Sequence, residues 1–241
     1  MSLLEKFERL LLYANIIEPQ YFILSVVFFL LLTGWKFALV FFVLVIIHEN
    51  GHAWEAMRQR MGFHGITVYP FGGLAHISGL PTRMSMLSIC LMGPIWGLAP
   101  SVVLLAAYYL TQNADFAAGA AAMATLNLLN LLPIAILDGG KVAKALTGKP
   151  KQTFIAGTIL AGILLLFDPG LILFVFLITY FGYNVELKSE LENRMYTDPV
   201  LEMDIAKGFL AYLAVIGCFL VVLALAGGLT DPFYWQDVLV H

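Results

Sequence analysis

The chain has 241 residues and a formal net charge of −3, and 61% of its residues are hydrophobic while only 12% are charged. Soluble globular proteins are about half apolar and about a quarter charged, so this composition excludes a water-soluble globular protein. The apolar residues lie in blocks that approach the ~20 residues needed to cross a bilayer. We therefore predict an all-α polytopic membrane protein with about six to seven transmembrane helices.

The first twenty residues lack a basic start followed by a small-residue cleavage site, so we expect no removable signal peptide here. Between Leu3 and Leu11 the apolar residues recur at helical spacing, with charged residues between them. This pattern fits either a helix that lies in the cytosolic interface or an extension of the first span.

Apolar blocks follow one another along the whole chain. They cover roughly Gln20–Thr33, Trp35–Met57, Met84–Thr111, Phe116–Leu137, Thr153–Phe167, Gly170–Asn184 and Ile205–Leu229. Gly34 and the run Asp168-Pro169-Gly170 are turn signals, and they predict tight hairpins between neighbouring spans. No soluble domain is expected, so residues 1–241 are predicted to form one domain, with a catalytic core at about 35–147 and accessory spans at about 153–229.

The basic residues predict the orientation in the membrane, because Lys and Arg accumulate in cytoplasmic loops. With a cytosolic N-terminus, Lys36 is the one clear exception among the basic residues of the loops. We therefore expect a multi-pass protein with its N-terminus in the cytosol. The compactness of the chain suggests a bacterial or archaeal cell membrane.

The loop between the second and third spans is unlike the rest of the chain. Residues Phe63 to Gly79 are rich in glycine and β-forming residues and are broken by Pro70, Gly72 and Gly73. This composition predicts short strands or a β-hairpin.

The central motif is His48-Glu49-Asn50-Gly51-His52. Histidines four residues apart lie on one face of a helix and can bind one zinc ion, while the glutamate between them can reach a water on that ion. The simpler alternative is that the two histidines have only a structural role, in packing or in capping a helix. Their position at the end of an apolar run argues against it, since ionisable side chains are costly in lipid unless they face a functional interior.

A catalytic zinc site needs a third protein ligand, and Asp138 is the best candidate. It follows Asn130 and Pro133, which breaks the helical hydrogen bonding, and precedes Gly139-Gly140, which lets the chain turn tightly. The alternative for Asp138 is the N-cap of a helix over Lys141–Leu146.

These residues resemble the site-2 proteases, intramembrane metalloproteases with His-Glu-x-x-His on one span and Asn-x-x-Pro-x-x-x-Leu-Asp-Gly on another. The chain matches both motifs at every defined position, and Pro70-Phe71-Gly72-Gly73 and Gly93-Pro94 also look like the family's. The resemblance covers about Phe41 to Val142. Many relatives append a PDZ or CBS domain, and we expect neither in this chain, which has no room for them.

The resemblance implies one zinc ion held by His48, His52 and Asp138, with Glu49 as the general base. Asn130 would bind substrate or stabilise the oxyanion, and the loop residues Phe71, Gly72 and Gly73 would contact substrate. The implied reaction is hydrolysis of peptide bonds in or near transmembrane segments, close to the cytosolic face. The expected partners are membrane-spanning protein substrates and the lipid bilayer, with no nucleic acid, and the sequence does not define the oligomeric state.

Two other functions fit parts of the pattern. A noncatalytic zinc-binding membrane protein, either a pseudoprotease or a metal-handling protein, would need no general base, so Glu49 argues against it. In such a site His76 could close the fourth position, although His64 and His76 are more simply explained as hydrogen-bonded loop residues. A metal transporter would need further ionisable residues across the membrane, and the last three predicted spans have none in their interiors.

Overall fold

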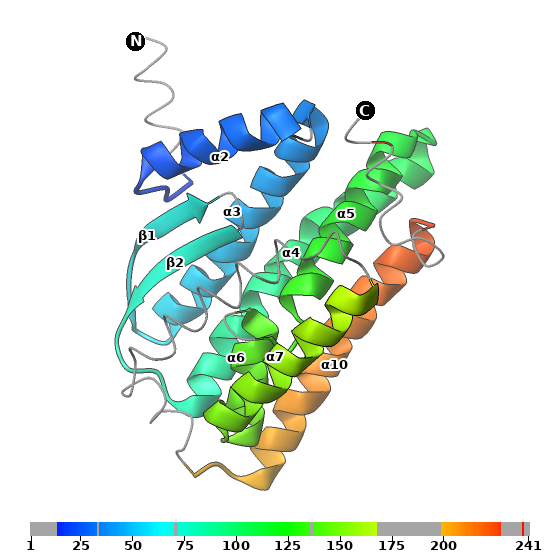
Figure 1. Cartoon of the computed structure of the whole chain (residues 1–241). Coiled ribbons are helices and arrows are strands. Elements are labelled where there is room, and N and C mark those ends of the chain that lie inside the picture. The colour runs from blue at the N-terminus through cyan, green and yellow to red at the C-terminus, as the bar shows by residue number, and fades with distance from the viewer. Residues whose placement is uncertain are drawn as a thin grey trace. The chain divides into compact units, whose positions relative to one another are not determined.

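Figure 1 shows the computed structural model of the chain, which describes residues 14–32, 34–69, 72–134, 137–167, 199–227 and Val238. The described elements are α2 Pro19–Leu32, α3 Gly34–Arg58, β1 Gly62–Tyr69, β2 Gly72–Ser78, α4 Arg83–Thr111, α5 Ala114–Asn130, α6 Asp138–Thr147, α7 Pro150–Phe167 and α10 Glu202–Leu225. The predicted helix at Leu3–Leu11, the predicted span Gly170–Asn184 and the loop residues Pro70 and Phe71 lie outside the described residues.

The chain forms two compact units, and both are built from discontinuous segments. The first consists of Met1–Gly79, Met92–Asn127 and Gly217–His241, and the second of Leu80–Leu91 and Leu128–Ile216. Helices α4, α5 and α10 therefore run from one unit into the other. The expectation of a single domain over the whole chain stays a prediction.

In the first unit, α2 and α3 form a helical hairpin. Gly34 opens α3 with φ 82°, a left-handed conformation that glycine adopts without strain, so the predicted turn at this residue is confirmed. Aromatic rings fill the contact between the two helices: the Phe29 and Phe41 centroids lie 4.3 Å apart, and those of Phe22 and Phe42 lie 5.2 Å apart.

The predicted β-hairpin is also confirmed. Strands β1 and β2 pair antiparallel, with Ile66 opposite Ala75, and pack against α2 and α3 (Figure 1). The other edge of β1 is occupied as well, because Ile66 donates its N–H to the Asn15 carbonyl (2.7 Å) and accepts from the Ile17 N–H (3.0 Å). Strand β1 is thus paired on both sides, while the outer edge of β2 has no strand partner among the described residues.

Glycines allow the helices of the first unit to approach closely. A Cβ on Gly51 of α3 would lie 2.6 Å from the Met92 carbonyl oxygen and 2.9 Å from the Trp96 Cβ, both on α4. A Cβ on Gly97 of α4 would lie 2.7 Å from the Asn127 Oδ1 on α5. These contacts are shorter than any ordinary van der Waals contact, so both positions require a hydrogen in place of a side chain.

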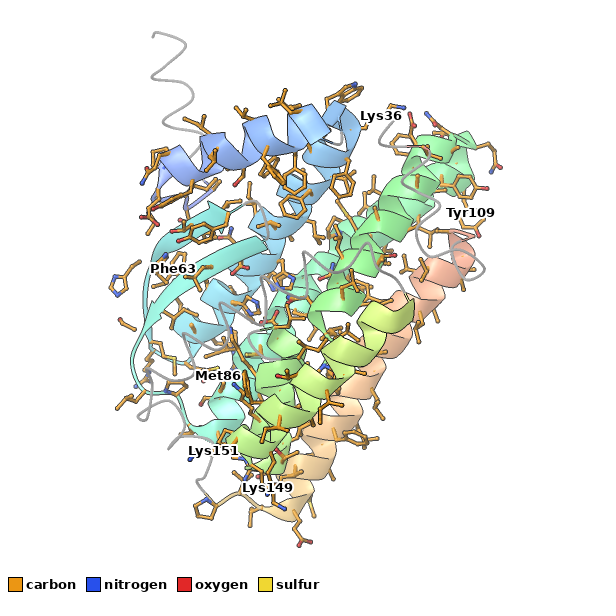
Figure 2. All side chains as sticks on the ribbon, viewed as in Figure 1. Lys36, Phe63, Met86, Tyr109, Lys149 and Lys151 are labelled. Atoms are coloured by element: carbon orange, nitrogen blue, oxygen red, sulfur yellow. The ribbon has the colours of Figure 1, made fainter. Side chains whose placement is uncertain are left out.

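In the second unit, the C-terminus of α6 is closed by a buried arginine. Arg83 donates to the carbonyl of Ala145 and to that of Leu146, the latter at 2.7 Å, and Gly148 ends the helix with φ 65°. A cation at this end interacts favourably with the helix dipole. Figure 2 shows Lys149 and Lys151 at the same end of this unit, where α7 begins, and Met86 near the start of α4. The two lysines and Arg83 therefore gather basic side chains at this end of the second unit.

Three of the described helices, α3, α4 and α10, are long and apolar enough to cross a membrane, and α2 is a shorter apolar helix. This agrees with a mostly helical membrane protein, but the predicted count of six to seven spans is not confirmed. Helix α5 ends at Asn130, whereas the predicted span ran to Leu137. The last turn tightens, with Leu131 and Leu132 bonded to carbonyls three residues back, and Pro133 has no N–H to continue the helix.

Large apolar side chains lie exposed on the outer faces of these helices. Examples are Leu31 on α2, Val103 and Leu110 on α4, and Leu210 on α10, which are 65–86% exposed. Such exposure would be unfavourable in water, but it suits helices whose outer faces contact lipid, because their backbone groups are bonded internally.

The close contact at Gly51 predicts a loss of stability in Gly51→Ala. The added methyl would meet the backbone oxygen of Met92, which no rotamer change can move, so α3 and α4 must separate. Overpacking of this kind costs about 1–3 kcal/mol. The melting temperature in detergent should fall relative to wild type and to Gly217→Ala, whose added Cβ meets nothing within 4 Å. Equal melting temperatures for all three proteins would contradict this contact.

Candidate metal centre

His48, Glu49 and His52 form a buried group on α3. Their ligand atoms lie within 4.8 Å of one another, and this is the group of possible metal ligands found in the described part of the chain. The Nε2 atoms of His48 and His52 lie 3.1 Å apart, and the two rings meet edge to face at 80°. The i, i+4 spacing on the helix brings the two imidazoles together, as the sequence predicts.

The two imidazole nitrogens fit a zinc ion. Two ligands bound tetrahedrally at ~2.0–2.1 Å lie roughly 3.3 Å apart, close to the separation of the two Nε2 atoms. A Cβ on Gly93 of α4 would lie 2.3 Å from the His52 Nε2 and 2.8 Å from the His48 Nε2. Because residue 93 is glycine, the space beside both nitrogens is left clear, and these residues could bind one metal ion.

The other ring nitrogen of His48 contacts a residue that the sequence did not single out. His48 Nδ1 lies 3.0 Å from Asn127 Oδ1, and Asn127 Nδ2 donates to the Met123 carbonyl at 2.9 Å. Since a carbonyl oxygen only accepts, His48 carries its proton on Nδ1, and Nε2 keeps a lone pair for a metal. The available signal was an asparagine in an apolar helix, three residues before Asn130.

Glu49 points toward the β-hairpin. Its Oε2 accepts the backbone N–H of Ala75 at 3.0 Å, and a Cβ on Gly73 would lie 2.4 Å from its Cγ. Gly73 therefore makes room for this carboxylate beside β2. Gly72 has φ 144°, and a Cβ there would meet nothing within 4 Å. The two loop glycines therefore serve different purposes: Gly72 allows the backbone conformation of the turn, and Gly73 allows the close contact with Glu49.

Asp138 belongs to the second unit and is held there by Asn130. Asn130 Nδ2 donates to Asp138 Oδ2 at 2.6 Å, and the Asp138 N–H points to Asn130 Oδ1 at 3.4 Å. A Cβ on Gly139 would lie 2.0 Å from the Leu131 carbonyl oxygen, so the tight turn after Asp138 needs glycine. Asp138 is 5% exposed.

The alternative role of Asp138 as an N-cap is wrong. The N-cap of α6 is Leu137, no side chain makes a capping hydrogen bond, and Asp138 is the first residue of the helix. Its carboxylate is engaged by Asn130 and does not close the helix end as a cap would. That Asp138 is the third ligand of the metal on His48 and His52 stays a proposal.

The remaining histidines of the hairpin have hydrogen-bond partners of their own. His64 Nε2 lies 2.8 Å from Ser78 Oγ, and His76 Nε2 lies 2.8 Å from Thr67 Oγ1. Thr67 in turn donates to the Glu18 carboxylate. These contacts agree with the simpler interpretation of both histidines as bonded hairpin residues.

Three comparisons with known proteins show what this chain is similar to. The model of peptidase family M50 matches residues 36–125. A zinc metalloprotease of Methanocaldococcus jannaschii is 31% identical over 167 residues, which cover 61% of this chain and 48% of that protein. The structure of the site-2 protease from the same organism aligns with a TM-score of 0.50 at 21% identity over 75% of this chain and 88% of that one, which shows the fold alone. The chain thus spans about half the length of its curated relative.

The clear space at Gly93 predicts that Gly93→Ala weakens zinc binding. The added methyl would occupy the position beside both Nε2 atoms and force one imidazole away. We expect the zinc dissociation constant, measured by chelator competition on metal-stripped protein, to rise about tenfold or more. Gly119→Ala is the control, because its added Cβ meets only side-chain ends, Leu104 Cδ1 at 3.1 Å and Val40 Cγ2 at 3.7 Å. Zinc binding by Gly93→Ala at the wild-type affinity would show that the ion binds elsewhere.

Proposed function

We propose that the protein is an intramembrane zinc metalloprotease of the site-2 protease type, because the model of peptidase family M50 matches residues 36–125. It hydrolyses peptide bonds in or near the transmembrane segments of other proteins, close to the cytosolic face. The observation that supports this most directly is the pair of Nε2 atoms of His48 and His52, 3.1 Å apart beside Gly93, with the Glu49 carboxylate in the same buried group.

In this proposal His48, His52 and Asp138 would hold one zinc ion, and three protein ligands are typical of a catalytic zinc site. When bound, the ion supplies a Lewis acid and lowers the pKa of a water toward ~7. Glu49 takes the proton from the attacking water and later returns it to the leaving amine. The Ala75 N–H, which donates to Glu49 Oε2, keeps one carboxylate oxygen oriented toward the hairpin.

The substrate presents a difficulty that the hairpin can solve. A transmembrane helix uses its carbonyls in its own hydrogen bonds, so the segment to be cut must first become extended. An extended segment can be held by adding a strand to an open sheet edge. The edge of β1 is already taken by residues 15–17, so we assign substrate binding to the outer edge of β2.

The register of the hairpin supports this choice. Ile66 directs both its N–H and its C=O toward Asn15 and Ile17, so its partner Ala75 directs its own peptide groups to the outer edge of β2. Glu49 lies at this edge, since it accepts the Ala75 N–H. A segment bound along β2 would therefore lie beside the general base. Gly73 would contact it there, and Phe71 and Gly72 would do so at the turn.

We further propose that the protein is a multi-pass protein of a bacterial or archaeal cell membrane with a cytosolic N-terminus. The exposed apolar faces of α2, α4 and α10 support contact with the lipid bilayer. The basic residues Arg83, Lys149 and Lys151, which share one end of the second unit, support a cytosolic location for that end.

The role of Glu49 predicts the outcome of Glu49→Gln. Loss of the general base should lower the cleavage rate by about 10²–10⁴-fold, while zinc stays bound because the histidines are unchanged. The measurement is cleavage of a panel of single-span membrane substrates by purified protein in detergent, with zinc content determined in parallel. Glu202→Gln, at an exposed position at the start of α10, is the matched control and should cleave like wild type.

Two results would count against catalysis by this site. Cleavage by Glu49→Gln at the wild-type rate would exclude Glu49 as the base. Zinc bound by both proteins with no cleavage by either, across a broad panel, would favour the noncatalytic zinc-binding function instead.

The outer edge of β2 predicts a specific effect of Ala75→Pro. Proline is tolerated where an edge strand directs its N–H outward, but it removes the donor to Glu49 and to any added strand. Loss of a hydrogen bond to a charged group costs about 1.5–3 kcal/mol, so kcat/KM should fall about tenfold or more while zinc content is unchanged. Ala75→Gly keeps the N–H and is the control. Equal kcat/KM in Ala75→Pro and Ala75→Gly would rule out this edge.

A further inference from the structure

Helix α5 carries two asparagines three residues apart, and each one bonds a different proposed zinc ligand. Asn127 lies 3.0 Å from His48 Nδ1, and Asn130 donates to Asp138 Oδ2 at 2.6 Å. Resting on the proposed zinc site, we propose that Asn127 and Asn130 are a pair of positioning residues that set the zinc affinity, Asn127 through His48 and Asn130 through Asp138. This gives Asn130 a different role from the substrate or oxyanion contact expected from the sequence.

Asn127 is held in one orientation. It is 1% exposed, and both ends of its amide are used, with Oδ1 toward His48 Nδ1 and Nδ2 donating to the Met123 carbonyl. A flipped amide would place its oxygen against the Met123 oxygen, so the side chain cannot reverse without losing that bond. Gly97 completes the fit, because any Cβ there would lie 2.7 Å from Asn127 Oδ1.

The consequence for His48 is a fixed tautomer and a fixed ring plane. An acceptor at Nδ1 keeps the proton there and directs the Nε2 lone pair to the side where His52 Nε2 lies, 3.1 Å away. Metal-binding histidines are generally oriented by a partner of this kind, and removal of the partner weakens metal binding about 10–100-fold.

Asn130 restrains Asp138 in a comparable way. The Nδ2 group donates to one carboxylate oxygen, and Oδ1 faces the Asp138 N–H at 3.4 Å, so the amide spans both the side chain and the backbone of Asp138. This arrangement depends on the break at the end of α5, where Pro133 stops the helix and Gly139 allows the return past Leu131.

The three-residue spacing of the two asparagines places them on one face of α5, where each contacts a different proposed ligand. Each contact lies within its own unit, the His48 contact in the first and the Asp138 contact in the second. Residues three apart on a helix share one face, so α5 offers both amides on the same side at its C-terminal end. Asn127 is buried and Asn130 is partly buried. Amides are costly in an apolar span, and orientation of the two ligands accounts for both of them.

The test is zinc affinity, which does not depend on catalysis. Zinc dissociation constants are measured by chelator competition on metal-stripped full-length protein in detergent, with thermal unfolding as a check that each variant is folded. Asn127→Leu and Asn130→Leu should each raise the dissociation constant about 10–100-fold. Asn127→Asp loses the donor to the Met123 carbonyl but still accepts the proton of His48 Nδ1. It should therefore bind zinc more tightly than Asn127→Leu, whereas a merely structural role would not distinguish acceptor from non-acceptor.

Asn50→Leu is the matched control. Asn50 also uses both ends of its amide, accepting from Asn15 at 2.7 Å and donating to the Ile46 carbonyl at 2.8 Å, but neither partner is a proposed ligand. Its zinc affinity should equal that of wild type. If Asn127→Leu does not fold, Gly97→Ala displaces the Asn127 amide without changing it and should also weaken zinc binding.

The outcomes separate this inference from the proposed function. Folded Asn127→Leu and Asn130→Leu proteins that bind zinc as tightly as wild type would overturn the positioning role and leave the protease proposal standing. A wild-type protein that binds no zinc, with or without these substitutions, would overturn both.

Discussion

The constraint on which the site depends is that lipid offers no hydrogen-bond partner to a polar side chain. Every polar group placed in an apolar helix must therefore be bonded inside the protein. The buried site residues obey this constraint: His48 bonds Asn127, Glu49 bonds the Ala75 amide, and Asp138 bonds Asn130. The bonds that make burial tolerable also orient these groups, so satisfying the polar atoms and arranging the site are one structural problem.

Close backbone approach is the means by which these bonds form. Gly51, Gly93 and Gly97 bring α3, α4 and α5 together within the first unit, and a Cβ at any of them would overlap a neighbouring group. Side chains as short as asparagine reach across only because the helices are this close. The same principle operates at Gly73, where the hairpin approaches Glu49, and at Gly139, where the chain returns past Leu131.

What the sequence predicted correctly was local. The His48–His52 motif, the turn at Gly34 and the β-hairpin depend on spacing or on turn residues within a few positions, so each could be recognised from the chain alone. Asn127 could not be assigned, because its partner His48 lies 79 residues away. The end of α5 at Asn130 was missed because the span was drawn from its apolar pattern, which continues to Leu137, although Pro133 marked a break in the helical bonding. The prediction of Asp138 as an N-cap was wrong because its carboxylate bonds Asn130, a residue of the preceding helix, and not the backbone at the start of α6.

The pairing of residues 15–17 with β1 determines which edge of the hairpin stays open to an added strand. A hairpin packed on a helix has two open edges, and an extended chain could add to either one. Here the N-terminal segment closes the β1 edge, and the Glu18–Thr67–His76 contacts link the same segment to both strands. The edge that remains is the one whose Ala75 amide donates to Glu49. The proximity of a docking edge to the general base thus follows from which edge the preceding chain occupies, and Glu49 and an incoming strand would compete for the same N–H.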